Sequence, residues 1–160
     1  MKTFKLPKDF TEKWLENLRS GKYSQGRNYL MQVEISENGD INNKKFCCLG
    51  IACLPYVEIE EFERTSLDYN LGYPVEYEDI REMKDFPEEL LSHESMLPKI
   101  LSYLNDGFYE SLYKKYLKEF PHLIFLRVPT IIKRDSESEP IQYSFEEIAE
   151  FIEQNVELKE

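Results

Sequence analysis

The strongest local signal in this sequence is an amphipathic helix near its carboxyl end. Ser144 and Glu147 have the spacing of a reciprocal capping box at the start of a helix. The residues that follow repeat apolar side chains at helical intervals, and together they form one stripe: Phe145, Ile148, Ala149, Ile152 and Val156. Such a stripe has to be buried against other elements, so the chain is predicted to fold around a packed, helix-containing core.

A second amphipathic helix is predicted near the start of the chain. Asp9 is placed to cap this helix, Glu12 follows as its reciprocal partner, and Gly21 is a suitable stop. The apolar face of this helix contains Phe10, Trp14, Leu15 and Leu18.

A β-hairpin is predicted after the first helix. Residues 29–35 alternate between two faces, Asn38-Gly39 is a strong tight-turn signal, and residues 45–48 can form the return strand. A short apolar helix over 49–54 should follow.

The remaining pattern is richer in helices than in strands. Helices are expected from Pro98 and over 108–120, with short ones near 77–83 and 87–93, and an apolar run favours a strand over 123–133. No repeat or linker divides the chain. We therefore predict one α+β domain over 1–160, helix-rich, with a small antiparallel sheet made of the hairpin 29–48 and the strand 123–133.

The negative charge is concentrated in one segment. The formal net charge is -11, and residues 58–94 carry thirteen acids against three bases, which accounts for ten of those charges. This segment belongs to an acidic, tyrosine-rich excursion over 56–94, which is a solvated face, a DNA-mimic surface or a docking site for a basic partner. General nucleic-acid binding is not expected, because it needs a broad cationic surface.

A purely basic, glycine-containing loop contrasts with this acidity. The stretch RSGKYSQGRNYL begins at Arg19 and contains no acid. Arginine offers a planar fork to a phosphate and lysine a movable charge, while Tyr23 can stack and Gln25 can form hydrogen bonds. These cations either bind an anion or offset the negative end of the preceding helix dipole and the nearby acidic segment. The candidate ligand-binding residues of the loop are Arg19, Lys22, Tyr23, Gln25 and Arg27.

Two further motifs carry polar or reactive groups. Cys47, Cys48 and Cys53 do not have the spacing of a zinc knuckle, so we expect buried free thiols, with a metal-binding or reactive thiol as the alternatives. Asn105 and Asp106 precede a glycine, which is ordinary helix-end chemistry, yet the pair can also bind a ribose hydroxyl or an amine. No metal and no cofactor is predicted.

Four of these motifs together resemble a widespread group of small phage and prophage proteins. The matching stretches are NLRSGKYSQGRNYL after Trp14, FCCLGIAC at 46–53, LND at 104–106 and SFEEIAEFIE at 144–153. In that group the last two motifs lie close together, whereas here residues 107–143 separate them. A basic residue that often follows the loop in the group is replaced here by Met31-Gln32.

The resemblance implies a phage accessory protein in the cytoplasm of a host cell and does not supply an activity. Small phage proteins without enzymatic signatures often counter host defence. Three hypotheses follow: a module that binds a small phosphorylated, nucleotide-derived ligand through the loop 19–27; an inhibitor that docks a host defence protein through 58–94; and an enzyme, the least favoured because no catalytic constellation is recognisable. No run of residues is apolar enough to span a membrane. The sequence leaves a homo-oligomer open.

Overall fold

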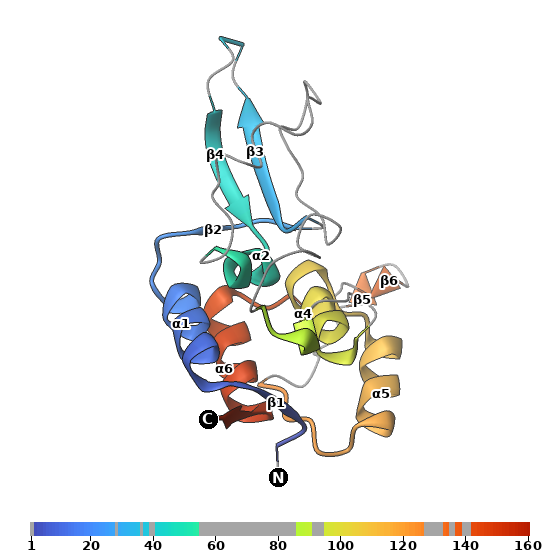
Figure 1. Ribbon diagram of the computed structural model, residues 1–160. Coiled ribbons are helices and arrows are strands. Elements are labelled where there is room, and N and C mark those ends of the chain that lie inside the picture. Colours follow the sequence, from blue (N-terminus) through green and yellow to red (C-terminus); the bar gives the residue numbers. More distant parts are fainter. Residues whose placement is uncertain are drawn as a thin grey trace.

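The computed structural model describes residues 2–27, 29–35, 37–38, 41–54, 86–90, 95–126, 133–134, 137–138 and 142–160 (Figure 1). The elements in chain order are β1 (Phe4–Pro7), α1 (Lys8–Arg19), β2 (Ser24–Gln25), β3 (Met31–Ile35), β4 (Ile41–Phe46), α2 (Cys48–Cys53), the 3-10 helix η2 (Glu88–Leu90), α4 (Met96–Asp106), α5 (Glu110–Glu119), β5 (Lys133–Arg134), β6 (Glu137–Ser138), α6 (Phe145–Asn155) and β7 (Val156–Lys159). The predicted helix-rich α+β class is confirmed.

Helices α1 and α6 pack side by side (Figure 1). The capping box of α6 forms as predicted: the Glu147 N–H donates to the Ser144 hydroxyl, and the Ser144 N–H donates to the Glu147 carboxylate, each at 3.2 Å. Val156, predicted as the last residue of the apolar stripe of this helix, begins β7 instead and is still buried.

The predicted start of α1 is wrong. The helix begins at Lys8 with Pro7 as its N-cap, because β1 runs directly into it, and Asp9 lies in the first turn, where its charge favours the helix dipole. The predicted end is confirmed, because Ser20 caps α1 and Gly21 follows with φ 73°, a left-handed conformation that favours glycine.

The hairpin is confirmed and extended by a third strand. Strands β3 and β4 pair antiparallel, β2 pairs with β4 in parallel, and the hairpin projects from the helical body (Figure 1). The return strand lies earlier than predicted, since Cys47 already caps α2.

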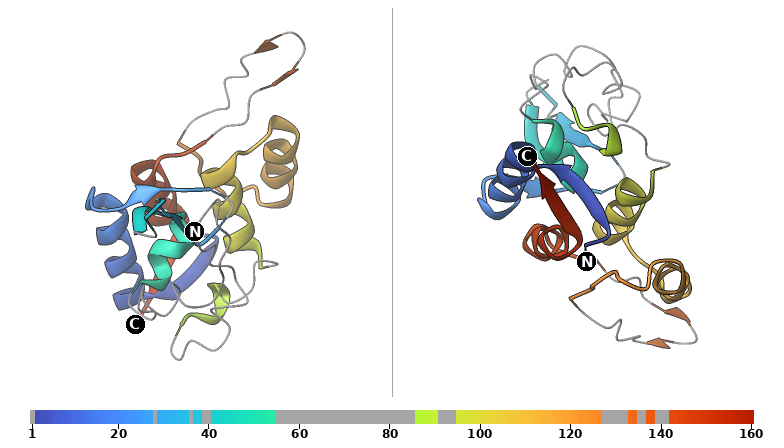
Figure 2. Two further views of the ribbon diagram at one scale, coloured as in Figure 1. Left: turned by 90° about the horizontal axis from the view of Figure 1, so that it is seen from above. Right: turned by 60° about the horizontal axis from the view of Figure 1, so that its bottom comes forward.

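A parallel pair of terminal strands was not predicted. β1 lies beside β7 with Phe4 opposite Val156 and Pro7 opposite Lys159, so strands from opposite ends of the sequence are neighbours (Figure 2). Nothing local in either segment signals this pairing, because a parallel partner can lie anywhere in the sequence.

The predicted strand over 123–133 forms only in part. Residues 123–126 pair with no strand that the structure describes, 127–132 lie outside the described residues, and 133–134 form β5, which pairs antiparallel with β6. The side chain of Asn155 takes the place of a neighbouring strand, since it accepts from the Ile124 N–H at 2.8 Å and donates to the Ile124 carbonyl at 2.9 Å.

The other predicted helices differ from the structure mainly at their ends. Helix α4 begins two residues before Pro98, and α5 is shorter than 108–120 at both ends. Of the predicted helix over 87–93, residues 88–90 form the single turn η2 and 91–94 lie outside the described residues, as does the predicted helix over 77–83. Most of the acidic excursion 56–94 also lies outside them.

The buried side chains form one apolar cluster that includes residues from both ends of the chain. The largest fully buried members are Trp14, Phe108, Phe151, Leu6, Ile51, Leu90, Ile100, Leu101, Leu104, Ile148 and Ile152. Helix α2 rests on the base of the hairpin at Gly50, where an added Cβ would lie 1.7 Å from the Leu30 carbonyl oxygen. Only glycine allows this backbone approach.

Candidate functional site

The amide of Asn105, in the last turn of α4, joins three other segments of the chain. Its Oδ1 accepts from the Gln25 side-chain amide at 2.9 Å and from the Cys48 N–H at 3.2 Å. Its Nδ2 donates to the Gly26 carbonyl at 2.8 Å and to the Asp106 carboxylate at 2.9 Å. The side chain is fully buried, and these four bonds use its full hydrogen-bonding capacity. We call this arrangement the Asn105 junction.

The same junction places the last two motifs next to each other. The Gln25 side-chain amide also donates to the Tyr143 carbonyl at 2.9 Å, and the Tyr143 N–H donates to the Leu104 carbonyl at 2.8 Å. Residues 104–106 and the start of α6 are therefore adjacent in space although residues 107–143 separate them in the chain. Three of the four sequence motifs meet here, and Tyr143, the residue before the fourth, joins them.

The cysteine motif holds α2 in place. The Cys47 sulfur caps the helix by accepting from the Gly50 N–H at 3.4 Å, and the Trp14 indole donates to the Cys48 carbonyl at 2.8 Å. Burial raises the pKa of the Cys47 thiol to about 12, and burial also raises the pKa values of Cys48 and Cys53. All three are buried free cysteines, as expected. Protonated, buried thiols are poor nucleophiles. In the described ranges, no three or more His, Cys, Asp or Glu side chains form a group that could hold a metal ion.

The three cations of the basic loop have different surroundings. Arg19 points to α6, where its guanidinium pairs with Glu146 at 3.5 Å, Glu150 at 3.5 Å and Glu153. The hydrogen bond with Glu153 is the main reason why the pKa of Arg19 is raised, and that with Arg19 is the main reason why the pKa of Glu153 is lowered. Arg19 thus clamps α1 to α6.

Lys22 and Arg27 lie on the surface. The Arg27 guanidinium donates to the Gln142 side-chain oxygen, and the Gln142 amide donates to the Asp106 backbone carbonyl at 3.3 Å. Neither cation forms an ion pair with another residue that the structure describes. Tyr23 packs edge-on against Phe46 with ring centroids 5.6 Å apart and keeps part of its surface exposed.

The predicted site residues therefore separate into three groups. Gln25 and Asn105 belong to the buried junction, and Asp106 and Arg27 connect to it, Arg27 through Gln142. Lys22 and Tyr23 lie on the loop itself, and Arg19 is directed away from it. Sequence reasoning missed Gln142, which no motif contains.

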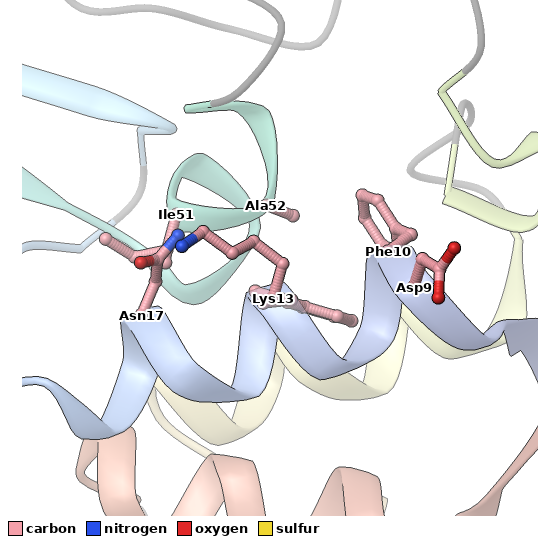
Figure 3. Close-up of a pocket in the computed structure, with 7 residues that line it drawn as sticks. Asp9, Phe10, Lys13, Asn17, Ile51 and Ala52 are labelled. Carbon is pink, nitrogen blue, oxygen red and sulfur yellow. The ribbon is translucent and has the colours of Figure 1, made fainter.

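A hollow between α1 and α2 was also missed (Figure 3). It has a volume of about 240 Å³, a floor of apolar side chains and a rim formed by Asp9, Lys13 and Asn17. The spacing of these three polar residues, four apart on one helix, is visible in the sequence. The second wall, supplied by Ile51 and Ala52, is not.

The fold and the junction define a small helix-rich α+β protein whose sequence motifs serve to join its helices to a hairpin. The chain belongs to the family described as a domain of unknown function, DUF8296, whose model matches residues 6–156. No curated protein and no solved structure matches the chain. No helix among the described residues has the length and apolar character needed to cross a membrane.

Proposed function

We propose that this protein is a non-enzymatic binding module for a small phosphorylated, nucleotide-derived ligand, held at the exposed part of the basic loop by Lys22 and Arg27. The observation that carries the proposal is the contrast among the loop cations. Arg19 is neutralised by three glutamates, whereas Arg27 is oriented by the neutral amide of Gln142 and presents its charge at the surface. In a protein with a net charge of -11, an oriented surface guanidinium without an acidic partner in the described ranges suits an anion.

The other predicted residues take supporting parts in this proposal. Gln25 and Asn105 hold the loop in place, because both side chains form hydrogen bonds inside the Asn105 junction. Tyr23 offers a partly exposed ring for stacking, and the half-buried Asp106 offers a carboxylate to a ribose hydroxyl. The ligand class and the role in countering host defence, within the cytoplasm of an infected cell, are proposed from the resemblance to phage proteins.

The test is a thermal-shift screen against nucleotides, cyclic oligonucleotides and ADP-ribose derivatives, followed by calorimetry on any hit. A ligand at 100 times its dissociation constant should stabilise the fold by about 2.7 kcal/mol. Two charge-assisted hydrogen bonds contribute about 3 kcal/mol or more, so the double variant Lys22→Ala, Arg27→Ala should lose at least about 100-fold in affinity.

Two matched variants complete this test. Arg19→Ala removes a loop cation that faces α6, so it should lower the melting temperature and keep the affinity. Lys115→Ala removes an exposed cation of α5 and should change neither the melting temperature nor the affinity. Unchanged affinity in the double variant would contradict the assignment of the loop.

The alternative function, inhibition of a host defence protein through residues 58–94, predicts a complex that weakens steeply with salt. Most of that segment lies outside the described residues, and the five described there, 86–90, do not favour docking over an ordinary surface turn. This alternative would be favoured if no ligand in the thermal-shift screen raised the melting temperature and the protein formed a salt-sensitive complex with a host protein.

A further inference from the structure

The hollow between α1 and α2 has an apolar floor that is already fixed in place. Trp14, Ile51 and Ala52 are buried beneath it, and Phe10 is half-buried at its edge. The centroid of the Phe10 ring lies 5.6 Å from that of Phe86, with the two rings edge-on, and 5.8 Å from that of Trp14, with the two rings tilted. A flat ligand would therefore meet a rigid aromatic and aliphatic surface, which costs little conformational entropy on binding.

The rim of the hollow has opposite polarity at its two ends. Asp9, Lys13 and Asn17 follow one another at intervals of four residues, which correspond to about 6 Å along a helix. Figure 3 shows the Lys13 side chain extending toward Asn17, so that an ammonium and an amide lie together at one end, while Asp9 and Phe10 lie at the other.

These rim groups can turn to a ligand at low cost. The Lys13 ammonium lies 3.5 Å from the Glu16 carboxylate, but both side chains are more than half exposed, and such surface pairs contribute little. The side-chain amide of Asn17 has no hydrogen bond to another residue in the part of the chain that the structure describes. An anion at this end would gain a cation and a donor together.

We infer that this hollow is a binding site for a small planar aromatic ligand that carries an anionic group at one end and an N–H donor at the other. The anion contacts Lys13 and Asn17, the ring covers the floor beside Phe10, and the donor contacts Asp9. The volume of about 240 Å³ lies below the range of pockets for drug-sized molecules, about 300–1,000 Å³, so the ligand has one or two rings. The site shares no residue with the loop proposed above.

The chain has a single tryptophan, and it lies in the floor of this site, which gives a direct readout. We would titrate the full ¹⁵N-labelled protein with 4-aminobenzoate and follow the one indole N–H signal of Trp14. A ligand of this size should bind with a dissociation constant on the order of millimolar. Benzoate, which lacks the donor, and aniline, which lacks the anion, should each bind more weakly.

Variants of the exposed rim keep the test independent of folding. Lys13→Gln and Asn17→Ala should each weaken 4-aminobenzoate by up to about tenfold, the loss expected when one charge-assisted bond is removed near solvent. Lys115→Gln and Arg27→Ala should leave binding unchanged, and the second also separates this site from the proposed phosphate site. The absence of a saturable shift, or equal binding in Lys13→Gln and Lys115→Gln, would overturn the inference.

Discussion

Two buried asparagines, each in the last turn of a helix, organise the two sides of this molecule. Asn105 at the end of α4 joins the loop, α2 and the start of α6, while Asn155 at the end of α6 holds Ile124 by two hydrogen bonds and donates to the Phe151 carbonyl at 2.8 Å. Both side chains are almost fully buried. They differ in what surrounds their partners.

Two partners of Asn105, the Cys48 N–H and the Gly26 carbonyl, are buried backbone groups, whereas Ile124 is 51% exposed. Water can therefore replace Asn155 at Ile124 but cannot easily replace Asn105 at Cys48. Asn105 and Asn155 should therefore contribute different amounts to the free energy of unfolding, although both are asparagines in the last turn of a helix. The following changes test this difference.

Gly50→Ala should have the largest effect, because it attacks the Asn105 junction through the backbone. The new Cβ would lie 1.7 Å from the Leu30 carbonyl oxygen, so α2 would have to move off the hairpin and carry Cys48 away from Asn105. We expect loss of more than about 4 kcal/mol of unfolding free energy or failure to fold, measured by urea denaturation followed by circular dichroism.

Gly21→Ala is the matched control for this glycine. Nothing lies within 4 Å of its Cβ position, and only its φ of +73° opposes a side chain. Gly21→Ala should lower the free energy of unfolding by about 1–2 kcal/mol. Equal losses of unfolding free energy in Gly50→Ala and Gly21→Ala would show that the close approach of α2 to the hairpin is not required for stability.

Asn105→Ala should rank next. It leaves the Cys48 N–H and the Gly26 carbonyl without their partner, and each buried unpaired group costs about 1–3 kcal/mol, so about 2–6 kcal/mol should be lost. For a chain of this size, each kcal/mol lowers the melting temperature by about 2–4 °C. Calorimetry measures the shift, and a loss below about 1 kcal/mol would contradict the central role of the junction.

Asn155→Ala should cost less, about 1–2 kcal/mol of unfolding free energy, because Ile124 is 51% exposed and its hydrogen bonds with Asn155 are only partly buried, so water can take over the lost partner. Hydrogen exchange gives the more specific readout, since the Ile124 amide should lose its protection while the Cys48 amide keeps it. A stability loss as large as that of Asn105→Ala would remove the proposed difference between the two sides.

Glu153→Gln should have the smallest effect and should depend on pH, unlike either amide. The hydrogen bond with Arg19 lowers the pKa of Glu153, so its contribution is fully present above the ordinary glutamate pKa of about 4.3 and is lost as pH falls through the lower folded value. Because the pair is partly exposed, we expect a loss of at most about 1 kcal/mol at pH 7 and a smaller loss at pH 3, below the ordinary glutamate pKa. Urea denaturation at both pH values measures this, with Glu16→Gln as the surface control.

Local signals explain what the sequence could predict. The capping box of α6, the Asn38-Gly39 hairpin signal and the apolar character of α2 each lie within a few residues, and each element formed near its expected place. The strand expected over 123–133 shows the opposite case. Its apolar run is real, but its partner at Ile124 is an asparagine side chain that no strand pattern could identify.

The sequence could predict which residues the candidate site contains but not how they pair with distant segments. The basic loop was visible in the sequence, yet the glutamates that neutralise Arg19 lie on α6, at the other end of the chain. Likewise, Asp9, Lys13 and Asn17 are visibly spaced for one helix face, but the wall opposite them comes from α2. Pairings between distant segments decide which polar residues are used internally and which remain for a ligand.

The pairing of β1 with β7 sets the order in which the molecule can be completed during its synthesis. The first strand leaves the ribosome early, but Phe4 has to wait for Val156, more than a hundred residues later. At about 5–20 residues per second, β1 remains without its partner for many seconds. Helix α1 and the hairpin can form in that interval, so the pairing of β1 with β7 should follow both of them.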